Sequence, residues 1–148
     1  MTSRPVEKYT SCDIEIRVRY AEVDAMGMLH HSRYWVYFEM GRTELLRQSN
    51  VAYRDLEQQG VFFVVARCEA KYLAPARYDD VLVLTTTITR VGAARIDHAY
   101  SLTRKLDGVV LATARTTLAC VDTTGRMIAI PPAARPDSLS DQANTTDA

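Results

Sequence analysis

The stretch that decides the fold runs Tyr34-Trp-Val-Tyr-Phe-Glu-Met-Gly-Arg-Thr-Glu-Leu-Leu-Arg-Gln48. It contains no proline and one glycine, so we expect it to form a helix over residues 34–48. At about 100° per residue, one face of this helix carries a set of residues that a core can accommodate: Tyr34, Tyr37, Phe38, Gly41 and Leu45. Apolar residues flank this face as well, and only a thin polar stripe remains: Glu39, Thr43 and Arg47. A helix with so little polar surface is expected to lie inside something larger.

The segments on either side of this helix have the pattern of strands. Before it, an apolar set alternates with charged residues and would share one strand face: Ile14, Ile16, Val18 and Tyr20. After Gly60, four segments are rich in β-branched or alternating apolar residues: 61–72, 81–90, 96–102 and 109–121. Turn sequences separate the last strands from one another: Tyr78-Asp79-Asp80, Val91-Gly92 and Asp107-Gly108.

Two shorter stretches complete the expected core. We expect a second helix from Val51 to Gln58, with Asn50 as its N-cap and Gly60 just past its end. The run from Val61 to Ala66 is apolar throughout, which predicts a buried strand.

This order of elements predicts an α+β fold, in which an antiparallel sheet of about five strands wraps round one long helix. A parallel α/β fold is excluded because the second half of the chain has no crossover helices. One curved sheet of this length cannot cover a helix that is apolar on most of its circumference. We therefore expect two subunits to pair through a sheet edge, with the helix flanks near the interface.

The ends of the chain have a different composition from its middle. Residues 1–11 are polar and without a period, and are expected to form a flexible arm. The segment 132–148 begins in a proline-rich sequence and ends in polar residues, which predicts a disordered tail. One domain is expected between them, over residues 12–131, and this agrees with a chain of 148 residues.

Composition excludes several functional classes. The chain has 18 basic and 18 acidic residues, which argues against a general nucleic-acid binder. No apolar run is long enough to span a membrane, and the N-terminus has no hydrophobic signal core, so we expect a cytoplasmic protein. Its cysteines, Cys12, Cys68 and Cys120, are widely spaced, which supports neither a disulfide framework nor a zinc cluster.

The chemically dense stretch lies between the first strand and the long helix. It combines Asp24, the turn-forming Gly27 and the neighbouring imidazoles of His30 and His31 with an expected helix N-terminus, which offers unpaired backbone N–H groups. A carbonyl bound there would be polarised by those N–H groups while Asp24 faces its carbon or a water. Spacing alone leaves open that Asp24 is simply a helix cap, or that His31 is the cap. Adjacent histidines point to different sides, so no metal site is expected.

The residues from Arg19 to Arg47 resemble the signature of the 4-hydroxybenzoyl-CoA thioesterase family of hot-dog proteins. The shared pattern is an Asp (Asp24), a Gly three residues later, an aromatic ten residues later and a Phe-Glu-x-x-Arg-Thr-Glu helix. Two later segments, Tyr72 to Asp80 and Val121 to Arg126, also resemble the family, so the similarity covers nearly all of residues 13–131. His30 and Arg33 stand where the closest members often have an aromatic residue and Asn.

The resemblance implies a hot-dog fold and hydrolysis of acyl-CoA thioesters. Asp24 takes the position of the catalytic acid, as nucleophile or as general base for water. The backbone N–H of His31 takes the position of the group that polarises the carbonyl, and its ring could orient Asp24 or water. Gly27 and Tyr34 match motif positions of the site, and Glu39 matches a position behind it. No cofactor is implied, because coenzyme A is part of the substrate.

Coenzyme A carries phosphates, and several arginines near predicted turns could contact them: Arg77, Arg90, Arg95 and Arg126. The expected partners are an acyl-CoA substrate and further copies of the chain, as a dimer or tetramer. Nucleic acid and membrane are not expected partners.

Two other functions remain open on the same scaffold. A hot-dog hydratase or dehydratase would need a histidine paired with a helix carboxylate, a role that His31 and Glu39 could fill. A non-catalytic acyl-CoA binder would hold the ester without releasing the thiol.

Overall fold

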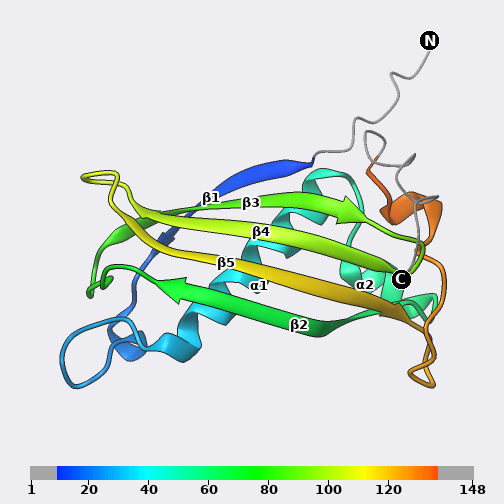
Figure 1. The fold of residues 1–148 in the computed structure, drawn as a ribbon, viewed down its shortest axis with the longest axis horizontal. Coiled ribbons are helices and arrows are strands. Elements are labelled where there is room, and N and C mark those ends of the chain that lie inside the picture. Colours follow the sequence, from blue (N-terminus) through cyan, green and yellow to red (C-terminus); the bar gives the residue numbers. More distant parts are fainter. Residues whose placement is uncertain (1–9, 137–148) are drawn as a thin grey trace, which may run out of the picture.

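The computed structural model describes residues 10–136 and has five strands, one long helix and a short second helix. The strands are β1 (Ser11–Arg17), β2 (Phe62–Tyr72), β3 (Val81–Val91), β4 (Arg95–Arg104) and β5 (Val110–Val121). The helices are α1 (His31–Gln48) and α2 (Tyr53–Gln58), with 3-10 turns at Tyr20–Glu22 and Pro132–Ala134. Figure 1 shows α1 running beneath the sheet.

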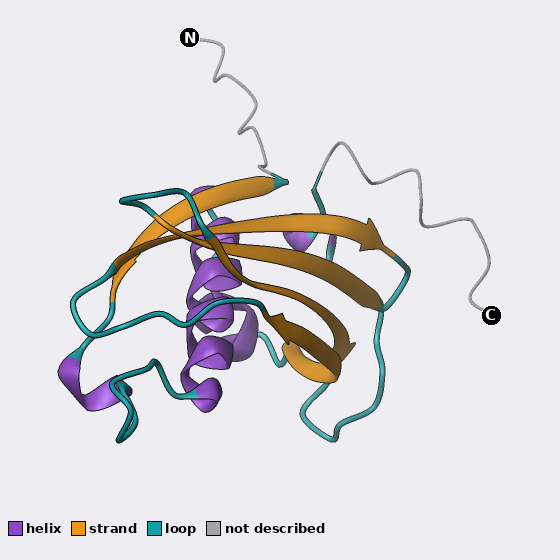
Figure 2. Ribbon diagram, turned by 60° about the vertical axis from the view of Figure 1, so that its left-hand side comes forward, coloured by secondary structure: helices purple, strands orange, loops and turns teal. Residues whose placement is uncertain are grey.

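All strands belong to one antiparallel sheet in the order β1-β3-β4-β5-β2. The sheet curves round α1 on one side, and no helix of residues 10–136 covers its other face (Figure 2). This is the predicted hot-dog fold. Because α1 lies between the first and second strands in sequence, those strands are free to take the two opposite edges of the sheet.

The predicted inner face of α1 is confirmed. Its buried residues are the five expected from the helical period: Tyr34, Tyr37, Phe38, Gly41 and Leu45. The helix packs against β1 and β3, and a Cβ at Gly41 would lie 2.7 Å from Leu84 and closer still to Thr86 Oγ1. Only a glycine permits this approach of helix to sheet, so Gly41 is the point at which α1 crosses β3.

Two apolar clusters fill the space between helix and sheet. The larger, around Phe38, Leu84 and Tyr100, lies under the first half of α1. The smaller, around Leu118 and Val91, lies near α2. Buried polar side chains on the inner face of the sheet include Thr86, His98 and Thr116, of which Thr116 is bonded to the Tyr100 hydroxyl at 2.7 Å.

Several predicted boundaries were wrong. The long helix begins at His31 rather than residue 34, because His30 caps it. The short helix begins at Tyr53, with Ala52 at the N-cap position, since Asn50 has a φ of 59° and cannot act as an N-cap. Tyr20 is exposed in a 3-10 turn rather than placed on the strand's apolar face, because β1 ends at Arg17.

The run 61–66 also differs from its prediction as a buried strand. Val64 and Val65 are 46% and 50% exposed. They lie on β2, which is an edge strand, whereas α1 packs against β1 and β3 at the other edge of the sheet. Val61 is buried in the smaller apolar cluster and Phe63 packs against it, so only the apolar character of Val64 and Val65 has no explanation inside one chain.

The predicted ends of the domain need one adjustment. Ser11 belongs to β1, and Pro132–Ala134 form a 3-10 turn in which Ala134 is buried. The fold thus extends to at least Pro136, because the Arg135 guanidinium donates to the carbonyl of Gly92 at 2.9 Å. The rest of the predicted arm and tail, residues 1–9 and 137–148, lies outside the described residues.

Candidate active site

The segment between β1 and α1 forms a small hairpin. The N–H of Asp24 donates to the carbonyl of Met28 at 2.8 Å, and the N–H of His30 donates to that of Glu22 at 2.9 Å. Gly27 makes the turn with a φ of 76°, which is the left-handed conformation that its position in the sequence suggested. The hairpin returns the chain to the start of α1, so Asp24 is held in the ladder that leads directly into the helix.

Only one oxygen of the Asp24 carboxylate is held by hydrogen bonds from residues 10–136. Its Oδ1 accepts hydrogen bonds from the N–H groups of Met26 at 2.9 Å and Met28 at 3.1 Å. No residue in the range 10–136 donates to Oδ2, and the side chain is partly exposed. This arrangement orients the carboxylate through backbone bonds and leaves one oxygen available for chemistry.

The cap of α1 is neither Asp24 nor His31. His30 takes that place, because its Nδ1 accepts from the N–H of Ser32 at 3.2 Å. His31 is the first residue of the helix, and its backbone N–H has no intrahelical acceptor. Its exposed ring lies against that of His30, with centroids 4.2 Å apart. The backbone N–H of His31, predicted to polarise the carbonyl, thus lies at a helix N-terminus. The His31 imidazole packs against the His30 ring.

Two tyrosines join β2 to the start of α1. Tyr34 is buried and meets Tyr72 edge-on at 4.9 Å, while the Tyr72 hydroxyl donates to the carbonyl of His31 at 3.4 Å. Burial raises the pKa of Tyr34, so its hydroxyl is neutral at neutral pH. Sequence reasoning missed Tyr72 because nothing local shows that the end of β2 meets a helix 41 residues earlier in the chain.

Glu22 is a second residue that sequence reasoning missed. Its side chain is 2% exposed, and Oε1 accepts from the N–H of Arg19 at 2.8 Å and from the Tyr37 hydroxyl at 2.9 Å. Burial alone would raise the pKa of this carboxyl, but the hydrogen bonds from Arg19 and Tyr37 hold it below its usual value. Glu22 therefore remains ionised and ties the hairpin that carries Asp24 to the middle of α1.

Glu39 lies largely in solvent. Its side chain is 70% exposed and lies 3.9 Å from the Arg42 guanidinium. It stands eight residues after His31, which is about 12 Å along a helix. The pair of His31 with Glu39 that a hydratase would need is therefore absent from the described part of the chain.

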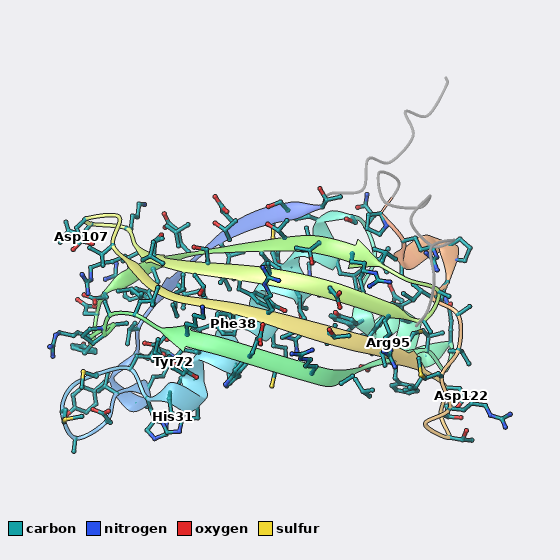
Figure 3. The ribbon with its side chains drawn as sticks, in the orientation of Figure 1. His31, Phe38, Tyr72, Arg95, Asp107 and Asp122 are labelled. Carbon is teal, nitrogen blue, oxygen red and sulfur yellow. The ribbon has the colours of Figure 1, made fainter. Side chains whose placement is uncertain are left out.

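The four arginines proposed for phosphate contact are divided between two ends of the molecule. Arg77 pairs with Met28 across an isolated β-bridge, next to the hairpin. Arg90 and Arg95 flank the β3–β4 turn, and Arg126 closes the turn that begins at Asp122. Arg95 and Asp122 lie at the opposite end of the sheet from His31 and Tyr72 (Figure 3). Within one chain, the four arginines therefore do not all lie near Asp24.

Residues 10–136 contain neither a metal site nor a membrane-spanning helix. No three histidine, cysteine or acidic side chains there are grouped closely enough to hold a metal ion. No helix in the same range has the length and apolarity that crossing a membrane requires.

Comparison with known proteins identifies similar chains. The model of the Thioesterase-like superfamily matches residues 18–142. The acyl-CoA thioesterase YbgC of Haemophilus influenzae is 37% identical over 108 residues, which are 72% of this chain and 78% of that protein. YneP of Bacillus subtilis is 35% identical over 88 residues, 60% of this chain and 64% of its own length.

The fold has close counterparts among solved structures. A DHNA-CoA thioesterase from Staphylococcus aureus superposes with a TM-score of 0.78 at 27% identity, over 80% of each chain.

Proposed function

Since the chain belongs to the Thioesterase-like superfamily, we propose that it hydrolyses the thioester of an acyl-CoA to the free acid and coenzyme A, with Asp24 as the catalytic carboxylate. The observation that carries this proposal is the hairpin. Two backbone N–H groups hold Oδ1 of Asp24, Oδ2 has no donor among residues 10–136, and the hairpin leads directly into the N-terminus of α1. The YbgC and DHNA-CoA relatives support the reaction class, because both are named as thioesterases of coenzyme A esters.

The geometry suggests separate roles for the His31 N–H and the Asp24 carboxylate. The thioester oxygen accepts a hydrogen bond from the His31 N–H, where the helix dipole stabilises the negative charge that develops in the tetrahedral intermediate. Asp24 then acts by one of two routes. It attacks the carbonyl carbon to form a mixed anhydride that water hydrolyses, or it removes a proton from the water that attacks. In both routes coenzyme A leaves as a thiolate and is protonated.

A second copy of the chain would complete the site. β2 is an 11-residue edge strand with exposed valines, whereas the other edge, β1, is shorter and carries Asp13, Glu15 and Arg17. Unprotected apolar edges tend to pair. Two β2 strands that pair antiparallel about a twofold axis would set the start of one strand against the end of the other. This would bring the partner copy's Arg95 end of the sheet towards Tyr72 and the hairpin, where it could meet the phosphates of coenzyme A.

The catalytic part of the proposal is tested with Asp24→Asn, which keeps the Oδ1 acceptor and removes the charge. Turnover measured by thiol release over a range of acyl-CoA esters should fall by about 100-fold or more, a loss of about 3 kcal/mol in transition-state stabilisation. The urea unfolding midpoint should not change. Asp55→Asn, an exposed residue of α2, is the matched control. An Asp24→Asn protein with undiminished turnover would refute the role, and hydration of an enoyl-CoA without thiol release would favour the hydratase.

The pairing is tested with Val65→Lys, which places a charge on the β2 edge. Sedimentation should show the mass of a single chain, and turnover should fall with it. Leu106→Lys, in the exposed β4–β5 turn, should leave both unchanged. If the Val65→Lys chain keeps its oligomeric mass, subunits do not pair through this edge.

A further inference from the structure

A cavity of about 30 Å³ lies towards the C-terminal end of α1, and the function proposed above makes no use of it. A single water needs roughly 10–15 Å³ measured in this way, so the space suits a ligand of only a few atoms. Its wall comes from α1, α2, β2, β3, β4 and residues 133–136. Arg42 lies 11 residues after His31 on α1, about 16 Å along the helix axis, so the cavity is distinct from the hairpin site.

The polar lining of this cavity is positively charged. Arg42 and Arg135 both line it, and none of the described residues that line it is acidic. The Arg42 side chain is only 10% exposed, and its charge acts against the burial that raises the pKa of Tyr53. The carboxylate with which it forms an ion pair is that of Glu39, which is 3.9 Å away and mostly in solvent. An exposed pair at this distance offsets little of the charge of a buried guanidinium.

The Arg135 guanidinium has N–H donors that form no hydrogen bond within residues 10–136. Its Nη2 donates to the carbonyls of Gly92 at 2.9 Å and Ala93 at 3.1 Å, which fixes the guanidinium against the β3–β4 turn. Its Nη1 is buried and has no acceptor within residues 10–136. A charged donor that is buried without a partner is costly, and a ligand that accepts from it recovers that free energy.

His98 adds a neutral polar group to the same wall. It is 4% exposed, and its Nδ1 has no partner in the described part of the chain. Burial, together with the charge of Arg42, lowers the pKa of His98 to about 3, so the ring is uncharged at neutral pH. A neutral imidazole carries one N–H, and the tautomer with this proton on Nδ1 can donate to a ligand.

We propose that this cavity binds a small carboxylate of the size of formate or acetate. The two oxygens of a carboxylate match the planar fork of a guanidinium, which is why arginine is preferred for such ligands. Arg42, Arg135 and the His98 ring would supply the donors, and Leu45, Ile88 and Ile96 line the remaining wall, where a methyl group fits. The ligand would join α1 to the C-terminal segment that carries Arg135.

The test is a titration of the whole chain with sodium acetate, compared with sodium chloride at equal concentration. The readouts are the unfolding temperature and the NMR signals of the His98 ring, identified among three histidines with His98→Gln. We expect acetate to give a saturable shift in both readouts that chloride does not give. If chloride saturates equally well, the assignment to a carboxylate is wrong. If acetate gives no saturable shift, there is no such site.

Variants test whether the named donors hold the ligand. Arg42→Met should weaken acetate binding by about tenfold or more, because it removes a charge-assisted bidentate contact. Arg47→Met is the matched control, since Arg47 lies on the same helix in solvent. Arg135→Met lies outside the core helix and serves if Arg42→Met does not fold. Unchanged affinity in Arg135→Met would overturn the proposal. Asp24→Asn should still bind acetate, which separates this site from the catalytic one.

Discussion

At the N-terminal end of α1 the buried carboxylate of Glu22 accepts hydrogen bonds from Arg19 and from Tyr37, whereas near the C-terminal end His98 and Arg135 hold buried nitrogen atoms that no residue in 10–136 satisfies. The same helix thus borders two regions that differ in whether their buried polar atoms have hydrogen-bond partners. In the first, the protein supplies every partner of the buried charge. In the second, the residues that carry the unsatisfied donors line a cavity.

This difference indicates that the first region holds a carboxylate in a fixed position, whereas the second can bind a ligand. A carboxylate that must act on a bound ester benefits from a rigid support, and the Glu22 bonds hold the hairpin of Asp24 in place without a ligand. Unsatisfied buried donors are costly when alone and become favourable when an acceptor enters. Changes at each end should therefore have different effects, and four substitutions measure this.

The largest effect is expected from Glu22→Ala. It leaves the buried Tyr37 hydroxyl without its acceptor and frees the hairpin from α1, which should lower the free energy of unfolding by about 2–3 kcal/mol. Turnover should fall as well, because Asp24 loses its support. Tyr37→Phe should cost about 1 kcal/mol. Urea unfolding of both variants and of the double variant shows whether they act together: the double loss should be smaller than the sum, and strict additivity would disprove the coupling.

Gly41→Ala should affect both ends, since Gly41 is where α1 crosses the sheet. The new methyl group would overlap the Thr86 hydroxyl and lie 2.7 Å from a Leu84 methyl carbon. Forcing the helix outward should cost about 1–3 kcal/mol, although alanine is the better helix former. Unfolding in urea measures the loss. A variant as stable as the parent would mean that the contact of helix and sheet is looser than the structure shows.

His98→Gln acts on the cavity end alone, through pH. The folded pKa of His98 is about 3, while in the unfolded chain a histidine titrates near its ordinary value of 6.5. Between these values the unfolded state binds a proton that the folded state rejects, so stability falls as the pH falls, by up to about 1.4 kcal/mol per pH unit. His98→Gln should remove this component. Urea unfolding at pH 7 and pH 5, in buffers without carboxylates, should show a smaller loss than in the parent, and equal losses would contradict the shifted pKa.

The smallest effect on stability is expected from Gly27→Ala, which acts on the hairpin alone. Nothing lies within 4 Å of the added carbon, but alanine at a φ of 76° costs about 1 kcal/mol. Gly108→Ala is a matched control, because Gly108 has a φ of 69° and is equally open. Both should lose similar stability by thermal unfolding. Only Gly27→Ala should lower turnover, and a similar fall in Gly108→Ala would show that turnover follows stability rather than hairpin geometry.

Local sequence patterns predicted more of the hairpin end than of the cavity end. Asp24, Gly27 and the start of α1 lie within eight residues of one another, so their arrangement follows from one turn and one helix start. The buried face of α1 was predictable for the same reason, since a helical period depends only on near neighbours. Val64 and Val65 were predicted wrongly because apolar content does not reveal whether a strand lies at an edge.

By itself, the sequence determined the order of the elements, the inner face of α1 and the acid-bearing turn before it. Only the tertiary structure decided that Tyr37 reaches Glu22, that Tyr72 meets Tyr34, and that Arg42, His98 and Arg135 share one cavity. The cavity residues come from a helix, a strand and a terminal segment whose separation in sequence carries no periodic signal. Their meeting depends on strand register and on the crossing point at Gly41, which only the packing of the whole chain fixes.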